Sequence, residues 1–310
     1  MPTGAVNLTP VIMKCSAPLL FLLLAASVWT GCRPDDIRFE DNPIPPYDGV
    51  PTVIVDAYLT RAYIDLIGRE PLPEEREAER NALRAGDLGL EARMALVDRL
   101  MGEDGTHDAA YARKLRDDLS GRFLDGASQE GMIEEVEFQR FLAMQDSLAG
   151  GFLYPFFHDL ADRLERTVTA VDDFRSGTIG WREVNRRYCD NVVYDDLNMN
   201  SFNFVNATFD DLFGRYPTEA EFEQAYAAVE FSAPSLLFGE LVDDKDSYLA
   251  RLVDNAEFDE NAIRWWGERL LVRPITGAEI AAWKDVAGPE VDIRSIQRLL
   301  ITSDEYADFE

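Results

Sequence analysis

The sequence has few of the residues that form covalent cross-links. It contains 3 cysteines among 310 residues, and Cys15 lies in an N-terminal segment that we expect to be removed. Only Cys32 and Cys189 would then remain, which excludes a disulfide framework. We expect Cys189 to be a small, buried apolar side chain. Stability must therefore come from an ordinary hydrophobic core, which a chain of this length can build.

Positive charge is also scarce. The chain has 30 Lys and Arg residues against 58 Asp and Glu residues, with a formal net charge of -28, and only 4 of the basic residues are lysines. An acidic excess of this size disfavours binding to nucleic acid or to anionic lipid through a basic face.

Motifs of common enzyme classes are missing. The 2 histidines, His107 and His158, have no partner at the spacing of metal ligands. There is no H-E-x-x-H, G-x-S-x-G, Walker loop or G-x-G-x-x-G, so zinc hydrolysis, serine esterase chemistry and nucleotide binding lack their usual evidence. We expect a protein that is not an enzyme. An enzyme with dispersed carboxylates remains an open alternative.

One apolar run does stand out, in the segment "MKCSAPLLFLLLAASVWTGC" that begins at Met13. Lys14 precedes the apolar residues 18–28, which is the layout of a secretory signal. The run is shorter than the roughly twenty residues that a membrane-spanning helix needs. Residues 1–12 carry no charge, which favours a translation start at Met13. We therefore expect residues 1–31 to be a signal peptide.

The end of this signal, "WTGC", resembles the lipobox of bacterial lipoproteins. The resemblance implies that Cys32 is lipidated on its sulfur and becomes the mature N-terminus, which would anchor the protein to a membrane. Trp29 departs from the usual Leu or Val of the motif. The alternative is an ordinary secretory signal that is cleaved a little further on.

Residues 32–51, which include "RPDDIRFEDNPIPPYDGVP", are rich in proline and aspartate and have no apolar period. This composition is typical of an extended tether. Its acidic run resembles the export signal of surface-exposed lipoproteins in Bacteroidetes. The resemblance implies a location at the bacterial outer membrane or cell surface.

From Val53 onward, apolar residues recur at the spacing of helices. In "VDAYLTRAYIDLIG" they fall at steps of three and four residues, which marks one face of a helix. No stretch of comparable length alternates with a period of two. The sequence therefore predicts an all-α chain.

Three similar turns divide these helices: "YIDLIGREPLPEE", "TFDDLFGRYPTEAEF" and "WGERLLVRPITGAEI". In the first two, Gly68 and Gly214 follow an apolar run, where glycine can take the left-handed conformation that ends a helix. A proline follows within a few residues, so the helix cannot resume at once. Each copy therefore predicts a helix, a tight turn and a second helix.

The second helix of each copy has its own start signal. Thr218 with Glu221, and Thr276 with Glu279, have the spacing of a capping box. The first copy instead places Pro73 early in the helix, followed by two glutamates near its positive end. A third apolar helix closes each unit.

These units resemble known helical families. The run "LTRAYIDLIGREPLPEE" and the segment beginning "LVDRLMGEDG" resemble a domain of unknown function in planctomycete surface proteins, often found beside cytochrome c modules. The C-terminal tandem is similar to a helical class that includes bacterial surface repeats and phycobilisome linkers. No C-x-x-C-H is present, so the haem attachment of the cytochrome-linked proteins is absent. We expect an N-terminal module at 52–126, a helical insertion at 127–197 and the tandem at 198–310.

Two polar segments could bind ligands. In "DDFRSGTIGWRE", Asp172, Ser176 and Glu183 follow the skeleton of a calcium-binding EF-hand loop, but Phe174 stands where an oxygen ligand belongs. The alternative is a plain helix-loop-helix turn. A second segment, "DNVVYDDLNMN", offers a hydrogen-bonding rim for a glycan or peptide, or else a loop with local side-chain caps. Its rim residues are Asp195, Asp196, Asn198 and Asn200.

The lipobox, the tether and the repeated turns together favour a helical scaffold or adaptor for another envelope protein. The alternative is an accessory lipoprotein that binds a glycan, a peptide or a cation such as calcium. No other cofactor is expected.

The anchor can be tested by Cys32→Ala. The variant should leave the membrane fraction and keep its helical circular dichroism, because the anchor and the helical body are separate parts of the chain. Membrane association that persists in the variant would contradict the lipobox assignment.

Overall fold

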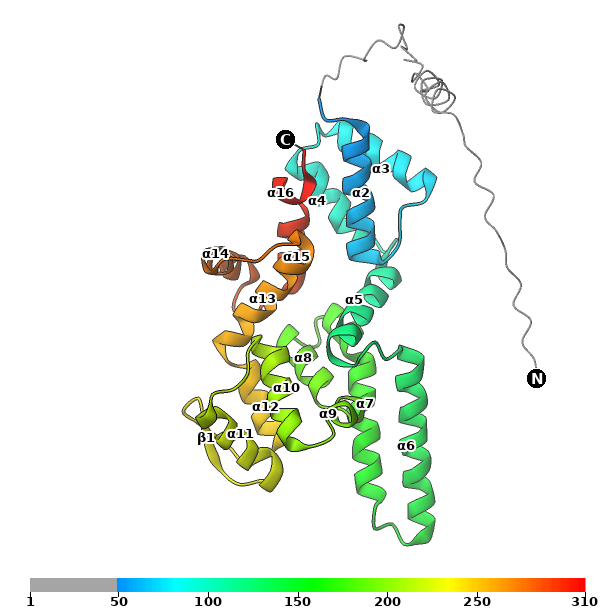
Figure 1. The fold of residues 1–310 in the computed structure, drawn as a ribbon. Coiled ribbons are helices and arrows are strands. Elements are labelled where there is room, and N and C mark those ends of the chain that lie inside the picture. Colours follow the sequence, from blue (N-terminus) through cyan, green and yellow to red (C-terminus); the bar gives the residue numbers. More distant parts are fainter. Residues whose placement is uncertain (1–48, 310) are drawn as a thin grey trace, which may run out of the picture. The chain divides into compact units, whose positions relative to one another are not determined.

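The structure, a computed structural model, describes residues 49–309. The signal peptide, Cys32 and all but the last residues of the tether lie outside the described residues. Helices make up 73% of what is described, so the prediction of an all-α chain is confirmed. Figure 1 shows their arrangement.

Fifteen helices and one small hairpin follow one another along the described chain. Their bounds are α2 (Thr52–Ile67), α3 (Pro73–Ala85), α4 (Leu90–Leu100), α5 (Asp108–Phe123), α6 (Gln129–Ala149), α7 (Tyr154–Arg175), α8 (Trp181–Cys189), α9 (Val192–Asn198), α10 (Ser201–Phe213), α11 (Glu219–Phe231), β1 (Ser235–Leu237), β2 (Glu240–Val242), α12 (Lys245–Val253), α13 (Ala256–Leu271), α14 (Gly277–Ala287), α15 (Ile293–Ile301) and α16 (Asp304–Ala307).

The glycine turns have the backbone conformation that the sequence predicts. Gly68 ends α2 at φ 74° and Gly214 ends α10 at φ 70°, both in the left-handed region. In the third copy Val272 holds the same position after α13, at φ 55°. A β-branched residue is strained there, because its Cβ crowds the backbone.

The helix starts are also confirmed. Capping boxes open α11, between Thr218 and Glu221, and α14, between Thr276 and Glu279. Helix α3 begins at Pro73, as the sequence predicts.

An arginine at each turn adds a longer connection to these caps. Arg69, Arg215 and Arg273 each donate two hydrogen bonds to the glutamate six residues later, Glu75, Glu221 and Glu279 respectively. Hydrogen bonds from Arg215 lower the pKa of Glu221 to about 2. Each of these glutamates also accepts the backbone N–H of the residue that caps its helix.

In the tandem, each turn arginine holds a second glutamate as well. Arg215 Nη2 lies 2.9 Å from Glu257 Oε2, and Arg273 Nη2 lies 2.8 Å from Glu305 Oε2. Both glutamates are the second residue of a helix, α13 and α16. One guanidinium therefore fixes the end of one helix and the beginnings of two others. In the first copy, Ala109 occupies the corresponding position of α5.

The hairpin of β1 and β2 was not expected from the sequence. Its strands pair antiparallel, with Leu237 opposite Glu240. Phe238 and Gly239 form the two-residue turn at φ 51° and 81°, as a type I′ turn requires. Strands of three residues are too short to show a period of two in the sequence.

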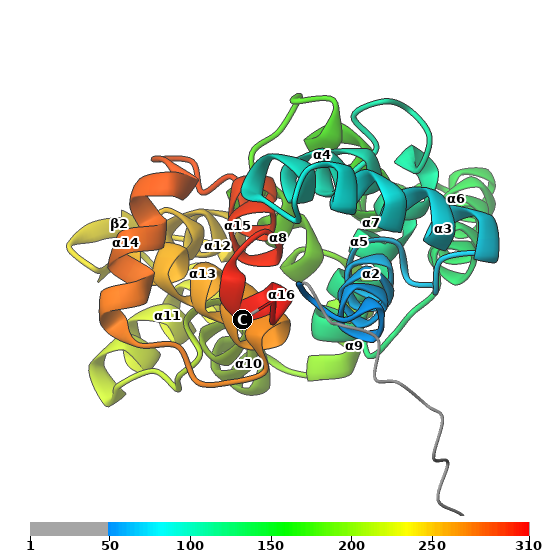
Figure 2. The same cartoon turned by 90° about the horizontal axis from the view of Figure 1, so that it is seen from above.

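The first and last helical units pack together. Helix α16 lies beside α2 (Figure 1, Figure 2), where the Tyr306 hydroxyl donates to Asp65 at 2.6 Å. Residues 49–309 belong to one compact unit. The expected boundary after residue 126 falls in the loop before α6, and that after residue 197 falls in the last turn of α9. The three expected segments therefore share one core.

A buried polar cluster joins several helices within that core. The Tyr194 hydroxyl of α9 donates to Asp211 of α10 at 2.7 Å, and the half-buried Arg122 of α5 donates to the Asp211 carbonyl. Cys189 is fully buried beside them, as expected, and burial raises the pKa of its thiol. Burial also raises the pKa of the Asp211 carboxyl to about 6.

The turn position can be tested in two copies at once. Gly214→Val should lower the free energy of unfolding by on the order of 1–2 kcal/mol, because a β-branched residue is strained at the positive φ of this position. A Cβ at this position would also lie 2.6 Å from Asn261 Oδ1. The loss is therefore larger if the Asn261 side chain cannot move. Val272→Gly should raise the free energy of unfolding by roughly 0.5–1 kcal/mol, because relief of strain exceeds the entropy cost of glycine. Denaturant unfolding measures the free energy of unfolding of both variants. If the two changes shifted this free energy in the same direction, the shared left-handed conformation would be contradicted.

The buried carboxyl gives a prediction about pH. Between the ordinary pKa of 3.8 and about 6, folded Asp211 keeps a proton that the unfolded chain has released. Rising pH should therefore destabilise the folded state over this window, by on the order of 2–3 kcal/mol in total. Asp211→Asn should remove this contribution, so the unfolding free energy of the variant relative to wild type should rise between pH 4 and 7. Parallel pH profiles would contradict it.

Candidate functional site

The residues that could support metal or acid–base chemistry are dispersed. Among residues 49–309, no group of three His, Cys, Asp or Glu side chains is placed to hold a metal ion. His107 packs edge-on against Tyr63, with ring centroids 5.8 Å apart. His158 is exposed, and its Nδ1 lies 3.0 Å from Asp162 Oδ2.

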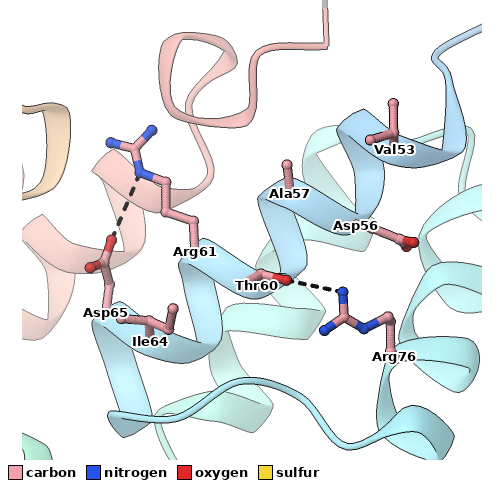
Figure 3. Close-up of a pocket in the computed structure, with 8 residues that line it drawn as sticks. All are labelled: Val53, Asp56, Ala57, Thr60, Arg61, Ile64, Asp65 and Arg76. Atoms are coloured by element: carbon pink, nitrogen blue, oxygen red, sulfur yellow. Dashed lines mark hydrogen bonds and ion pairs between the residues drawn. The ribbon is translucent and has the colours of Figure 1, made fainter.

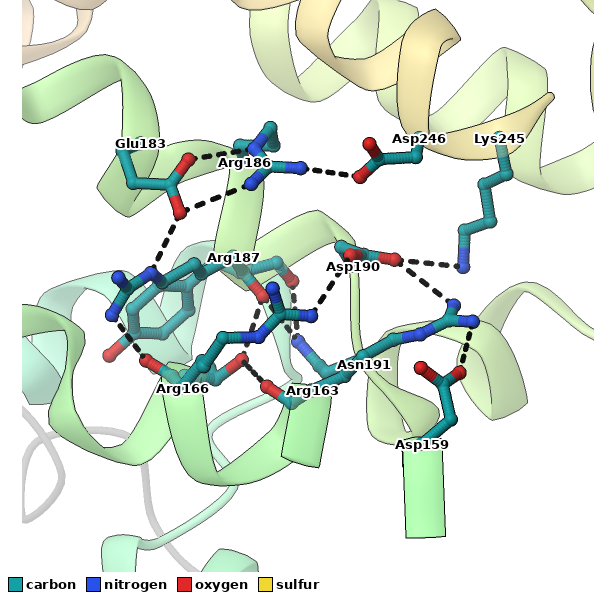
Figure 4. Close-up of polar contacts among 12 residues, drawn as sticks. Asp159, Arg163, Arg166, Glu183, Arg186, Arg187, Asp190, Asn191, Lys245 and Asp246 are labelled. Atoms are coloured by element: carbon teal, nitrogen blue, oxygen red, sulfur yellow. Dashed lines mark hydrogen bonds and ion pairs between the residues drawn. The ribbon is translucent and has the colours of Figure 1, made fainter. Parts of the chain in front are cut away.

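The calcium-loop residues are engaged with other groups. Helices do flank the loop, as expected, but Asp172 accepts from Arg116 at 3.2 Å. The Ser176 hydroxyl donates to the Asp173 carbonyl at 2.9 Å. Glu183 accepts from Arg186 and Arg187 at 2.7 and 2.9 Å (Figure 4).

These contacts argue against calcium binding in this loop. Burial alone would raise the pKa of Glu183, but the arginine hydrogen bonds bring it below its usual range. A cation would have to displace guanidinium groups from Asp172 and Glu183, so this geometry disfavours a calcium site. Calcium binding stays an untested prediction.

The same region contains a network of ion pairs that joins three helices. Asp190, at the end of α8, lies 3.2 Å from Arg163 of α7 and 3.8 Å from Lys245 of α12. Arg186 of α8 also reaches Asp246 of α12 (Figure 4). Each basic group therefore faces a carboxylate, and the arrangement fixes helices rather than exposing a reactive group.

The expected ligand rim is partly structural. Asn198 donates to the Tyr194 carbonyl at 2.8 Å, and Asn200 caps α10 by accepting from the Asn203 N–H at 2.9 Å. Asp195 is held by Lys245, while Asp196 is exposed. These are the local caps that the alternative interpretation described.

Two of the rim residues nevertheless line a pocket. Asp195 and Asn200 lie around a space of about 240 Å³ together with Phe204 and Lys245. The Lys245 ammonium lies 4.5 Å from the centre of the Phe204 ring. The pocket therefore combines one ion pair with one aromatic face, and could hold a small polar molecule.

A larger groove of about 500 Å³ runs along the outer face of α2 (Figure 3). Its apolar lining comes from Val53, Ala57 and Ile64. Its polar side chains are engaged: Asp56 pairs with Arg80 of α3, and the others hold α2 to α3, α13 and α16. The groove is a shallow apolar surface without convergent polar groups.

The most unusual surface lies on the hairpin of α6 and α7. Helix α6 packs extensively only against α7, and its buried side chains include Met132, Val136 and Ala143. The second half of its opposite face is also apolar and is exposed, with Phe141 at 50% and Leu148 at 79%. A helix that packs on one side only usually has a polar outer face. We call the exposed side chains Phe138, Phe141, Met144 and Leu148 the outer stripe of α6.

The tip of this hairpin extends the apolar surface. Residues 147–157, "SLAGGFLYPFF", contain no charged residue, and Phe152 is 90% exposed. Asp146 accepts the backbone N–H groups of Leu153 and Tyr154, both at 2.7 Å, which closes the loop. In Figure 1 this loop lies at the end of the described body opposite the start of α2.

This surface was not expected from the sequence. A signal was present, since apolar residues fall on both faces of the second half of the segment that forms α6. A helix that is apolar on both faces requires two partners, and the described chain supplies one.

None of the helices among residues 49–309 is long and apolar enough to cross a membrane.

Comparison of the chain with protein-family models, with curated proteins and with solved structures found no match.

Proposed function

We propose that this protein is a membrane-anchored bacterial lipoprotein that acts as a helical scaffold or adaptor for another envelope protein. Its lipid is attached at Cys32, its location is the outer membrane or cell surface, and its contact surface is the outer stripe of α6 with the hairpin tip. It performs no chemical reaction itself.

The exposed apolar face of α6 is the observation that carries this proposal. The surfaces of soluble proteins rarely expose contiguous large apolar side chains unless these contact another molecule. Aromatic and methionine side chains, which dominate the stripe, are also enriched in protein interfaces. The dispersed histidines and engaged carboxylates support the non-enzymatic part of the proposal.

A second candidate function is an accessory lipoprotein that binds a small polar ligand. The pocket around Asp195, Asn200 and Lys245 favours it, because an ion pair beside the Phe204 ring could orient such a ligand. The adaptor takes precedence, because three of the four rim residues already have intramolecular hydrogen bonds.

Site-specific photo-crosslinking in intact cells tests the adaptor. A photoreactive phenylalanine at position 141 should give one stoichiometric cross-link to an envelope protein. The same residue at position 241 is the matched control, because Leu241 is also exposed, at 64%, but lies on the β2 strand. The cross-link should disappear in a Leu148→Ser background, and the melting temperature should stay unchanged because Leu148 is on the surface.

Two results would contradict the adaptor. One is the absence of a cross-link from position 141 in cells that contain the anchored protein. The other is the same set of cross-links from positions 141 and 241, which would indicate random encounter.

A further inference from the structure

The outer face of α6 has a regular composition along its length. Residues 130, 134, 137, 141, 144 and 148 follow one another at alternating steps of four and three. This is the 3.5-residue period of the seam along which two helices pack in a coiled coil. At about 1.5 Å per residue the seam is about 27 Å long.

The two halves of this seam differ in chemistry. The first half consists of Glu130, Glu134 and Glu137, and the second of Phe141, Met144 and Leu148. All six are exposed. The seam therefore presents an acidic half near the start of α6 and an apolar half near the hairpin tip.

The three glutamates have no ion-pair partner within residues 49–309, although most basic side chains there do pair with a carboxylate. The nearest arginine in sequence, Arg140, is directed toward Asp162 and Glu165 of α7. This half of the seam therefore has no counter-charge among the described residues.

From this arrangement we infer that the seam binds a basic amphipathic helix of the partner protein. This inference rests on the proposed function and names the chemistry of the partner. The partner helix carries three apolar residues followed by three Lys or Arg residues, all at the same 3.5-residue period. Its apolar half covers the second half of the seam, and its cations face Glu130, Glu134 and Glu137.

The direction of the partner helix follows from helix dipoles. Cations are most stable near a helix C-terminus, and acids near a helix N-terminus. The glutamates lie in the N-terminal half of α6, so the basic half of the partner helix is its C-terminal half. The two helices therefore run antiparallel.

Charge also argues against two other occupants. A second copy of this chain has a net charge of -28 and would bring the same glutamates and no unpaired cation to the seam. A lipid bilayer would have to accept three carboxylates along the surface that it covers, which is costly. A basic helix is the occupant that satisfies both halves.

Fluorescence anisotropy with synthetic peptides tests the inference. The probe is a labelled peptide of about 20 residues with Leu at three successive seam positions and Arg at the next three, on an Ala and Gln background. It should bind the purified mature chain and weaken when NaCl rises from 50 to 500 mM, because salt screens the charge pairs. A peptide with Glu in place of Arg should bind at least about tenfold more weakly.

Variants of the protein show what each half of the seam contributes to probe binding. Glu134→Gln with Glu137→Gln should weaken probe binding about fivefold and flatten its salt dependence. Phe141→Ser should weaken it about tenfold and leave the salt dependence in place. The matched control is Glu223→Gln with Glu230→Gln, which neutralises two exposed glutamates of α11 and should change neither quantity. Circular dichroism should confirm that every variant is folded.

Several outcomes would overturn the inference: equal binding of the basic and acidic peptides, probe binding that the α6 glutamates do not affect, or no binding. Micromolar self-association, or binding to phosphatidylcholine vesicles, that Phe141→Ser abolishes would assign the seam to a second copy or to lipid. The cross-link from position 141 remains a separate test. A cross-linked envelope protein with no peptide binding would refute the basic helix and keep the adaptor.

Discussion

The arginine at each turn is the contact on which the helical body depends. Arg215 is hydrogen-bonded to Glu221 and to Glu257, and thereby connects the end of α10 to the starts of α11 and α13. A planar guanidinium suits this role because it presents donors on two edges at fixed angles, whereas an ammonium group does not. Arg273 repeats the arrangement with Glu279 and Glu305. The relative positions of consecutive helices are therefore set by directional contacts as well as by apolar packing.

The same constraint accounts for the preference for arginine over lysine in so acidic a chain. Carboxylates brought together by folding repel one another unless a cation lies between them. At Asp190 this repulsion is offset, because Arg163 and Lys245 approach its carboxylate from two different helices. Surface ion pairs contribute little individually, but here several converge at helix ends, where they fix geometry.

Local features of the fold could be predicted from the sequence, and long-range contacts could not. Gly68, Gly214 and the capping boxes at Thr218 and Thr276 depend on residues within one or two turns of each other, so their spacing carries the information. The second glutamates of the arginine contacts lie far along the chain, at Glu257 for Arg215. Nothing in the spacing indicates that such residues meet until the helices between them are placed.

For the candidate sites, too, local spacing could be predicted from the sequence and long-range contacts could not. The loop between α7 and α8 had the spacing of a calcium loop, yet Asp172 turned to Arg116 of a helix that lies far away in sequence. The polar rim borders a pocket through Asp195 and Asn200, but Asn198 and Asn200 satisfy backbone groups next to them. The apolar face of α6 was not expected, because composition alone does not show how many helices will cover a segment.

The position of the α6–α7 hairpin follows from the repeat itself. In the tandem, α13 follows the third helix of one unit with Glu257 at its start and opens the next unit with Val272 at its end, so one helix serves two units. In the first unit the corresponding helix α5 has Ala109 where the tandem has glutamate, and it makes no such contact with Arg69 among the described residues. Instead Asp118 of α5 bonds to Arg269 of α13. Helices α6 to α9 then separate α5 from α10, the helix that opens the next unit. The chain thus interrupts its repeat where the arginine contact is incomplete, and there a hairpin can extend outward without disturbing the contacts that hold the remaining helices.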